Sequence, residues 1–352
     1  MTSFWKGRRV LVTGHTGFKG GWLSAWLLSR GSEVTGLALD PPDGPGFFRH
    51  CGLGGRMRSL LGDVRDPGRV AGAFAESDPE LVFHLAAQPL VRRSFADPVL
   101  TFETNVMGTV HVLECARRAA ALRAVVVVTS DKCYRPAAAL RRHCEDDPLG
   151  GRDPYSASKA AAEMVAGAYG PSFLTLDGRG LATVRGGNVI GGGDWSEDRV
   201  VPDAVRAFAS GQSLGIRNPD AVRPWQHVLD PLGGYLEVAE RLYADPGGWS
   251  EPWNFGPDGD GVPVAQLADL IVEAWPGGRW TAEPSKGPVE APHLALDSGK
   301  AAARLGWRPR LSLREAVSAT VAWYRRALTD ASPEAMFDLS LRQIAAWEGT
   351  RR

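Results

Sequence analysis

The chain has 352 residues, of which 44% are hydrophobic and 23% are charged, so it is long enough to bury a substantial core. Lysine and arginine together number 40, as do aspartate and glutamate, and this balance excludes a global attraction to nucleic acid or to an anionic membrane. The sequence has no long apolar run, no signal-peptide pattern at its start and no C-x-x-C spacing, so we expect a cytoplasmic protein without a membrane span or a metal site.

The first predicted element is a buried strand over 10–12, and a glycine-rich turn follows it. Gly14, Gly17 and Gly20 form a G-x-x-G-x-x-G pattern between this strand and a helix expected over 21–30. Glycines at such a junction let the backbone approach a pyrophosphate and let the helix pack closely on the strand. The helix N-terminus then faces the anion, so the turn predicts a dinucleotide site.

A second strand, over 33–40, ends in Asp40. An acid at this distance from the glycine turn is placed to accept hydrogen bonds from ribose hydroxyls. Because such an acid also disfavours a 2′-phosphate, the pattern favours NAD over NADP.

Strands and helices continue to alternate along the chain, as in an α/β fold with a doubly wound parallel sheet. The β-branched run over 124–130 is typical of a central parallel strand that is buried on both faces. The other strands are expected over 81–88 and 181–185, and the helices over 102–121 and 154–169. Polar residues at the ends of these strands should meet in one crevice, because ligands bind beyond the carboxyl ends of parallel strands.

The alternation weakens after residue 190, where glycine, proline and tryptophan become more frequent. We therefore expect a Rossmann-type NAD-binding domain over 1–190, which includes the helix over 154–169. A smaller lobe for the substrate should occupy mainly 191–352, with some of this chain returning to the first domain.

The helix over 154–169 carries the main candidate for catalysis. Tyr155 and Lys159 are four residues apart, so they lie on the same helix face. A lysine ammonium there should lower the pKa of the tyrosine from about 10 towards the working pH. Tyr155 then becomes a candidate general base for an alcohol, and the dinucleotide site supplies a hydride acceptor.

Several longer motifs carry a resemblance to a known family. The narrowest are Ser130-Asp-Lys-Cys-Tyr134 and Arg223-Pro-Trp-Gln-His-Val228, and the others extend over most of the chain. On these motifs the chain resembles the extended short-chain dehydrogenase/reductase superfamily, and within it the CDP-glucose 4,6-dehydratases. The matching segments lie at 14–20, 86–91, 104–109, 129–134, 153–159, 187–195, 223–228, 253–257 and 305–309.

The resemblance implies an internal redox reaction on CDP-D-glucose, with NAD as cofactor. The sugar is oxidised at C4, loses water across C5 and C6, and receives the hydride back at C6, which gives a 4-keto-6-deoxy sugar. Tyr155 with Lys159 would be the base at the C4 hydroxyl, Ser130 would hydrogen-bond the same oxygen, and Asp131 would be the acid at C6. Lys132 could remove the C5 proton or act electrostatically, and it should also pair with Asp131 and lower the pKa of that carboxyl.

The resemblance also assigns binding residues. The cofactor-binding set comprises Gly14, Thr16, Gly17, Phe18, Lys19, Gly20, Asp40, Asp63, Val64, Leu85, Ala86, Ala87, Asn105, Thr129, Tyr155 and Lys159. The substrate-binding set comprises Gln88, Asn188, Arg199, Arg217, Arg223 and His227. Arginine suits a diphosphate because its guanidinium can bind phosphate in a bidentate manner, although a surface ion pair is the alternative for Arg217 and Arg223.

Two departures from the family keep other functions open. The segment 135–144, which follows the Asp131–Lys132 pair and is expected to border the sugar, lacks the aromatic residues usual there, and Pro292 stands where the family has histidine. These changes leave a CDP-sugar epimerase or oxidoreductase as an alternative, without net dehydration. A non-enzymatic NAD-binding protein of this fold is a third hypothesis, but such a protein would be expected to have lost Tyr155 or Lys159.

The resemblance further implies a homodimer. The helices over 102–121 and 154–169 match those that form a four-helix contact between subunits in this superfamily.

Overall fold

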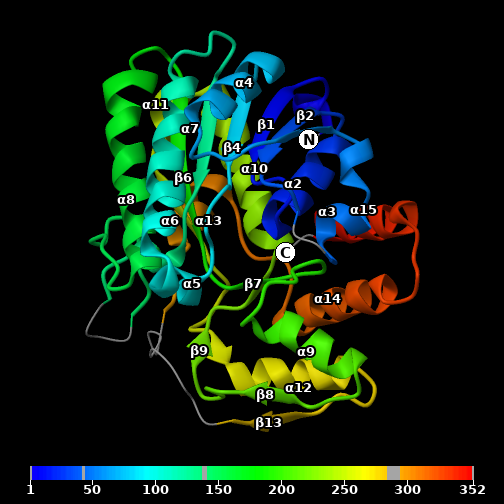
Figure 1. Cartoon of the computed structure of the whole chain (residues 1–352). Coiled ribbons are helices and arrows are strands. Elements are labelled where there is room, and N and C mark those ends of the chain that lie inside the picture. Colours follow the sequence, from blue (N-terminus) through cyan, green and yellow to red (C-terminus); the bar gives the residue numbers. More distant parts are fainter. Residues whose placement is uncertain (1, 42–43, 137–140, 284–293, 351–352) are drawn as a thin grey trace.

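The computed structural model describes residues 2–41, 44–136, 141–283 and 294–350 (Figure 1). Its centre is a seven-stranded sheet of order β11-β6-β5-β4-β1-β2-β3, in which every neighbouring pair is parallel. The strands are β1 (Arg9–Thr13), β2 (Glu33–Ala38), β3 (Arg58–Leu61), β4 (Leu81–His84), β5 (Ala124–Val128), β6 (Gly180–Gly186) and β11 (Pro252–Phe255). The predicted Rossmann-type fold is therefore confirmed.

The two faces of the sheet are covered by different helices. Alternate residues of β5 enter separate apolar clusters, with Val126 and Val128 in one and Val125 and Val127 in the other. This alternation is the period of two that a strand buried on both faces requires. One face packs on α2 (Phe18–Ser29) and α10 (Leu229–Ala244), and the other on α4 (Pro67–Ser77), α7 (Gly108–Ala116) and α8 (Pro154–Tyr169).

Two predicted helices have different bounds in the structure. Helix α2 begins at Phe18, three residues before its predicted start, so Gly20 lies inside its first turn. The helix expected over 102–121 begins earlier, as α6 (Pro98–Phe102), passes through a π-helical turn η2 (Glu103–Met107) and ends as α7 at Ala116. Helix α8 spans 154–169 as predicted, because Asp153 caps its N-terminus and Pro154 occupies its first position.

The second half of the chain builds a small lobe below the carboxyl ends of the strands and then returns to the sheet (Figure 1). The lobe contains α9 (Val200–Ala209), α12 (Val264–Ala274) and three two-stranded pairs. These pairs are β7 (Val189–Ile190) with β10 (Gln226–His227), β9 (Val222–Arg223) with β12 (Val262–Pro263), and β8 (Leu214–Ile216) with β13 (Trp280–Ala282). Strand β11 returns to the edge of the main sheet beside β6, so residue 190 does not divide the chain into two separate halves.

The remaining elements connect or cover these layers. The last helices, α14 (Leu313–Ala327) and α15 (Pro333–Gly349), pack on each other, and α15 also packs on α2. The shorter elements are α1 (Thr2–Trp5), α3 (Phe47–His50), η1 (Leu53–Gly55), α5 (Val91–Ala96), η3 (Asp131–Cys133), η4 (Gly170–Leu174), α11 (Pro246–Trp249) and α13 (Gly299–Leu305).

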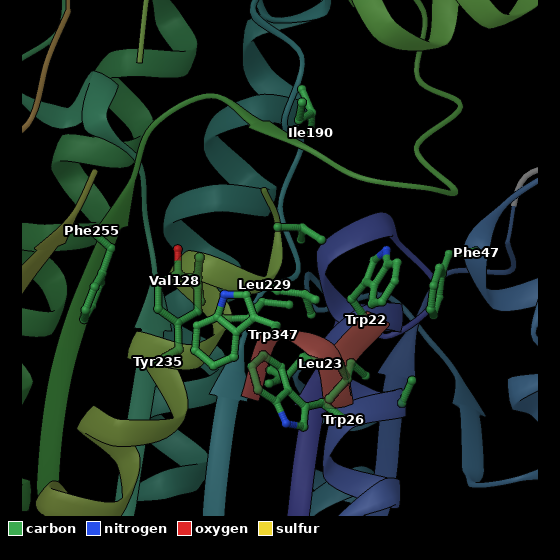
Figure 2. Close-up of a cluster of buried hydrophobic side chains, with 14 of the residues drawn as sticks. Trp22, Leu23, Trp26, Phe47, Val128, Ile190, Leu229, Tyr235, Phe255 and Trp347 are labelled. Atoms are coloured by element: carbon green, nitrogen blue, oxygen red, sulfur yellow. The ribbon is translucent and has the colours of Figure 1, made fainter. Parts of the chain in front are cut away.

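Tryptophans fix α15 against the core under α2 and α10, where Figure 2 shows Trp22, Trp26 and Trp347 close together. The rings of Trp26 and Trp347 meet edge to face with centroids 5.0 Å apart. The indole of Trp347 donates to Asp230 Oδ1 at 2.8 Å, and the backbone N–H of Arg310 donates to the same oxygen at 2.7 Å. Asp230 Oδ2 is buried and has no hydrogen-bond partner within the described part of the chain.

This buried carboxyl should make stability depend on pH. Burial raises the pKa of Asp230 from 3.8 to about 6, while the two donated hydrogen bonds oppose that shift. Because the folded state holds the proton more tightly than the unfolded state, the contribution of Asp230 to stability falls as pH rises from about 4 to about 6. We expect Asp230→Asn to lose this component, so its unfolding free energy relative to wild type should increase by about 2–3 kcal/mol between pH 4 and pH 7.

Urea titrations at the two pH values would measure this difference. The exposed Asp258→Asn serves as the control and should change little at either pH. A constant offset between Asp230→Asn and wild type would contradict the assigned role of Asp230.

Candidate active site

A cavity of about 1190 Å³ lies where the carboxyl ends of β1, β4, β5 and β6 face the small lobe. Its walls include the glycine turn, the ends of these strands, the first turns of α8, and residues of α9, β8 and β9. Most of the predicted site residues line this one space. They are Gly14, Thr16, Gly17, Phe18, Lys19, Gly20, Asp63, Val64, Leu85, Ala86, Ala87, Gln88, Thr129, Ser130, Asp131, Lys132, Tyr155, Lys159, Asn188, Arg199, Arg217 and Arg223.

The glycine turn is packed so closely that side chains are excluded. Gly14 has a φ of +78°, and a Cβ on it would lie 2.8 Å from the backbone nitrogen of Ala86. A Cβ on Gly20 would lie only 2.1 Å from the carbonyl oxygen of Gly14. At Gly17 the nearest atom would be 3.3 Å away, so that position is the most open of the three. The turn therefore keeps a backbone cradle before α2 that fits a pyrophosphate.

These distances predict different effects for the three glycines. We expect Gly20→Ala to displace the turn and to weaken NAD binding by at least about tenfold, because a Cβ that collides with backbone cannot be accommodated by a side-chain movement. Gly17→Val should leave the turn folded and weaken NAD through contact with the bound pyrophosphate. Gly167→Ala is a matched control, since its Cβ would meet open space on α8. Calorimetric titration of NAD would test all three, and unchanged affinity in both turn variants would place the cofactor elsewhere.

Two of the predicted cofactor residues do not line the cavity. Asp40 is exposed two residues after β2, and its contact with a ribose stays a prediction. Asn105 is buried behind the cavity wall, where its Oδ1 accepts the N–H of Gln88 at 2.8 Å and its Nδ2 donates to Ser158 Oγ at 2.8 Å. Asn105 therefore fixes the 86–88 segment from behind.

Ser130 and Asp131 lie buried at the end of β5. Ser130 Oγ donates to Asp131 Oδ1 at 2.9 Å and accepts the backbone N–H of Lys132 at 3.2 Å. Asp131 Oδ2 has no hydrogen-bond partner in the described ranges, and it lies 3.4 Å from the position of a Cβ on Gly187. A buried carboxyl oxygen without a partner is costly unless a ligand completes it, which suits a group that acts on the substrate.

Lys132 does not pair with Asp131 as we expected. Its side chain is half-buried and lines the cavity, but the described residues include no ion pair between the two. The role of Lys132 in proton transfer stays a prediction.

Tyr155 and Lys159 lie on one face of α8, both buried at the cavity. Burial raises the pKa of Tyr155 to about 12, while a hydrogen bond with Ser130 lowers it and the charge of Asp131 raises it further. Lys159 Nζ donates to the carbonyl of Val128 at 3.2 Å, and burial lowers its own pKa to about 8. The predicted lowering of the Tyr155 pKa was wrong, because burial of the phenol outweighs the hydrogen bond with Ser130 and the charge of Arg199, which lower that pKa.

Lys19, predicted to bind the cofactor, lines the cavity near the end of β6. Its Nζ lies 3.7 Å from the position of a Cβ on Gly186, at the end of β6, and it interacts electrostatically with Asp131 and Lys159. Burial lowers the pKa of Lys19 to about 8. Lys19 therefore adds positive charge to the reacting end of the cavity.

The predicted substrate-binding residues fall into two groups. Arg199 and Arg217 line the cavity in ion pairs with Asp194 at 3.0 Å and Asp198 at 2.9 Å, and Arg92 on α5 also pairs with Asp198 at 3.2 Å. Asn188 and the buried Arg223 line the same side.

Gln88 and His227 are engaged within the protein instead. Gln88 lines the cavity, but its side chain bonds Leu90 and Thr101. His227 is fully buried beside Trp22 and accepts the N–H of Leu229, away from the cavity lining, which favours packing over substrate contact.

Sequence reasoning missed most of the lobe side of the cavity. Pro202, Leu214 and Val264 form apolar wall there, and Asp203 lies beside them. Trp225 also lines the cavity. No local pattern marks these residues, because the wall is assembled from separate segments spread over residues 202–264.

The unusual segment 135–144 does not reach the cavity in its described residues. Instead, the backbone of His143 pairs with that of Ala295 and Asp297, and the His143 ring stacks on Tyr134 with centroids 4.7 Å apart. The expectation that this segment borders the sugar is thus wrong for 135–136 and 141–144, while 137–140 and Pro292 lie outside the described residues.

Comparison with known proteins places this fold and site in a class. The model of the NAD dependent epimerase/dehydratase family matches residues 10–254, and the chain belongs to this family. Among curated proteins, it is 49% identical to the CDP-glucose 4,6-dehydratase of Salmonella typhimurium over 330 residues, which cover 92% of each chain. It is 31% identical to a dTDP-glucose 4,6-dehydratase of Streptomyces griseus, over 90% of this chain and 94% of the relative.

Solved structures agree with this placement. The dTDP-glucose 4,6-dehydratase DesIV of Streptomyces venezuelae, crystallised with NAD and TYD bound, superposes with a TM-score of 0.76 and 29% identity, over 92% of this chain and 99% of that one. A UDP-glucose 4-epimerase of Thermotoga maritima with UDP-glucose superposes with a TM-score of 0.78 and 25% identity, over 91% and 99% of the two chains. The described helices include none that is long and apolar enough to cross a membrane.

Proposed function

We propose that this protein is an NAD-dependent CDP-glucose 4,6-dehydratase, which converts CDP-D-glucose to CDP-4-keto-6-deoxy-D-glucose. The single observation that carries the proposal is the 49% identity to a curated CDP-glucose 4,6-dehydratase over nearly the whole chain. The site agrees, because Ser130, Asp131, Tyr155 and Lys159 line one cavity beyond a glycine turn shaped for a dinucleotide.

In the oxidation step, Tyr155 takes the proton of the C4 hydroxyl as its phenolate, a form that the positive charge of Lys159 favours against the burial that raises the pKa of Tyr155. The glycine turn at Gly14, Gly17 and Gly20 would hold NAD, which would supply the hydride chemistry at C4 and C6. Ser130 hydrogen-bonds Tyr155 and holds the same substrate oxygen, while Lys159 provides positive charge behind the phenol.

In the elimination step, Asp131 gives a proton to the departing C6 hydroxyl. Its Oδ1 is held by Ser130, which leaves the buried Oδ2 directed at the substrate. Lys132 lines this end of the cavity and takes the C5 proton, while Lys19 stabilises the negative charge that develops at C5.

The diphosphate of the nucleotide sugar binds the arginines of the lobe. Arg199, Arg217 and Arg223 line the cavity from different elements, and a guanidinium is the side chain best suited to phosphate oxygens. Asn188 adds a neutral donor between them and the reacting sugar.

The part of the chain that the structure describes gives little support to the alternative of a CDP-sugar epimerase or oxidoreductase. That alternative rested on the unusual segment 135–144, whose described residues lie outside the cavity. The acid of the elimination step remains in place as Asp131, so the geometry favours dehydration.

The test is incubation of the purified protein with NAD and each of CDP-, dTDP-, UDP- and GDP-glucose, followed by mass spectrometry. We expect CDP-glucose alone to lose the mass of one water. Dehydration of another nucleotide sugar would contradict the cytidine preference. No change of mass with any of the four would contradict the function, and a new isomer on chromatography would favour the epimerase.

We also propose that the protein is a cytoplasmic homodimer. Exposed apolar side chains lie on the neighbouring elements α5, α6 and α8, among them Phe95 at 50%, Val99 at 66% and Met164 at 60% exposure. A second copy would cover this surface, and the continuous helix of α6, η2 and α7 together with α8 from each subunit would form a four-helix bundle. All four cysteines are free, which suits a reducing compartment.

Sedimentation velocity tests the dimer. We expect wild type to sediment as a dimer and Val99→Glu with Met164→Glu as a monomer, because two charges would be buried in the contact. The control Leu328→Glu, at an exposed apolar residue after α14, should remain dimeric. A monomeric wild type would contradict the proposal.

A further inference from the structure

A buried ion pair lies directly behind the catalytic helix face. Glu163 follows Lys159 by one turn of α8, so Tyr155, Lys159 and Glu163 form one row. Arg185, on β6, donates from Nε to Glu163 Oε1 at 2.9 Å and from Nη2 to Oε2 at 2.7 Å. Both side chains are 3% exposed, and neither lines the cavity, so neither contacts the substrate.

The carboxylate of Glu163 joins the three segments that carry the site. It accepts the hydroxyl of Thr129, which precedes Ser130, and that of Thr183 at 2.7 Å. With the two bonds from Arg185, it has four donors and is fully satisfied. The ends of β5 and β6 and the middle of α8 are therefore held by one charged group.

Arg185 extends the same network away from the cavity. Its Nη1 donates to the hydroxyl of Tyr134 at 2.7 Å and to the carbonyl of Glu145 at 3.1 Å. Tyr134 in turn donates to Asn254 Oδ1 at 2.7 Å on β11. The guanidinium thus fixes Glu163 in place from the far side.

Glu163 also supplies the negative charge next to Lys159. The pKa of Lys159 is lowered to about 8, mainly by burial; the ammonium of Lys19 on α2 adds to the lowering, and Glu163 opposes it. The other titratable groups packed around Lys159 are His84 on β4, whose pKa burial lowers to about 3, and the thiol of Cys133, whose pKa burial raises. Both are neutral at working pH, so Glu163 is the counter-charge to Lys159. Lys19 instead has Asp131 and Asp194 as its counter-charges.

We infer that Glu163 is a positioning residue of the oxidation step, which keeps Lys159 charged and in line behind Tyr155 while Arg185 holds Glu163 in register. The inference rests on the proposed function, because it needs a reaction in which Tyr155 and Lys159 act together. It assigns to the ion pair a role that depends on charge, beyond the packing of α8 on the sheet.

The test is the pH profile of CDP-glucose dehydration by Glu163→Gln. The glutamine keeps the shape and one acceptor oxygen but loses the charge. In wild type, we expect kcat to fall on the alkaline side as Lys159 loses its proton near pH 8. In Glu163→Gln, this alkaline limb should shift to lower pH by about one to two units. At pH 8 kcat should fall about tenfold, while KM and NAD affinity change less than about twofold, since Glu163 does not line the cavity.

Two further variants separate charge from structure. Glu163→Asp restores the charge, so its limb should stay near that of wild type even if its melting temperature falls. Glu114→Gln, on the adjacent α7, breaks a surface cluster with Arg117 and Arg118 and should leave the profile unchanged.

A last variant is needed if Glu163→Gln does not fold, because that substitution leaves the buried Arg185 without its counter-charge. Glu163→Met with Arg185→Met removes both charges, a replacement that buried ion pairs often tolerate, and its limb should also shift down. If Glu163→Gln or the double methionine variant folds and its alkaline limb of kcat stays at the wild-type pH, the inference is overturned. Absence of dehydration by wild type itself would instead overturn the proposed function.

Discussion

Tyr155→Phe should reduce turnover of CDP-glucose by about 10³-fold or more while NAD still binds. The substitution removes one buried oxygen and keeps the ring that packs at the start of α8. With no phenolic oxygen, the C4 hydroxyl has no base within the row formed with Lys159, so oxidation and every later step stop together. Steady-state kinetics and calorimetric NAD titration would measure the two effects.

Tyr235→Phe is the matched control. Tyr235 is a second buried tyrosine near Tyr155, and its hydroxyl has no hydrogen-bond partner within the described residues, but it does not line the cavity. Its removal should leave turnover within about twofold of wild type. If Tyr155→Phe kept more than about a tenth of wild-type activity, another group would have to be the base.

The sequence predicted the parts of the site that are built from local patterns. The glycine turn, the buried β5 and the capped α8 each carry their own signal, because backbone packing, β-branched residues and an Asp-Pro start act over a few positions. The cavity forms where these elements meet, at the carboxyl ends of parallel strands.

The parts that were not predicted depend on contacts between distant segments. The lobe wall with Pro202, Trp225 and Val264 is one case. The pKa of Tyr155 is another, since a helical spacing indicates a neighbouring lysine but contains no information on burial of the phenol. The Glu163–Arg185 pair joins α8 to β6 across 22 positions, and no motif connects the two residues.

The misplacement of segment 135–144 has the same origin. Its position directly after Asp131 and Lys132 suggested a wall of the sugar site. The bridge between Tyr134 and Leu149 and the pairing of His143 with 295–297 hold the described part of the segment outside the cavity lining. Closeness along the chain was therefore a poor guide to closeness in space.

Asp131→Asn should separate the two halves of the reaction. Asparagine keeps an oxygen for the hydroxyl of Ser130, which holds Asp131 Oδ1 at 2.9 Å, but it cannot release a proton to the C6 hydroxyl. We expect C4 oxidation to continue, with reduced cofactor accumulating to about one equivalent per subunit. Water loss should fall by about 10²–10³-fold, because general acid catalysis contributes on that scale.

Absorbance of the reduced cofactor and the product mass would be followed together. In the single-turnover product, a loss of two hydrogens without loss of water is the expected signature. Asp198→Asn is the control, since this exposed carboxylate also lines the cavity but is paired with Arg92 and Arg217. It should change KM and leave dehydration complete. Wild-type water loss by Asp131→Asn would assign the acid to another group, and the buried, unpartnered Oδ2 would then need a different explanation. Loss of both steps would instead show that Asp131 is already required when Tyr155 takes the C4 proton, because the two residues share Ser130 as a hydrogen-bond partner.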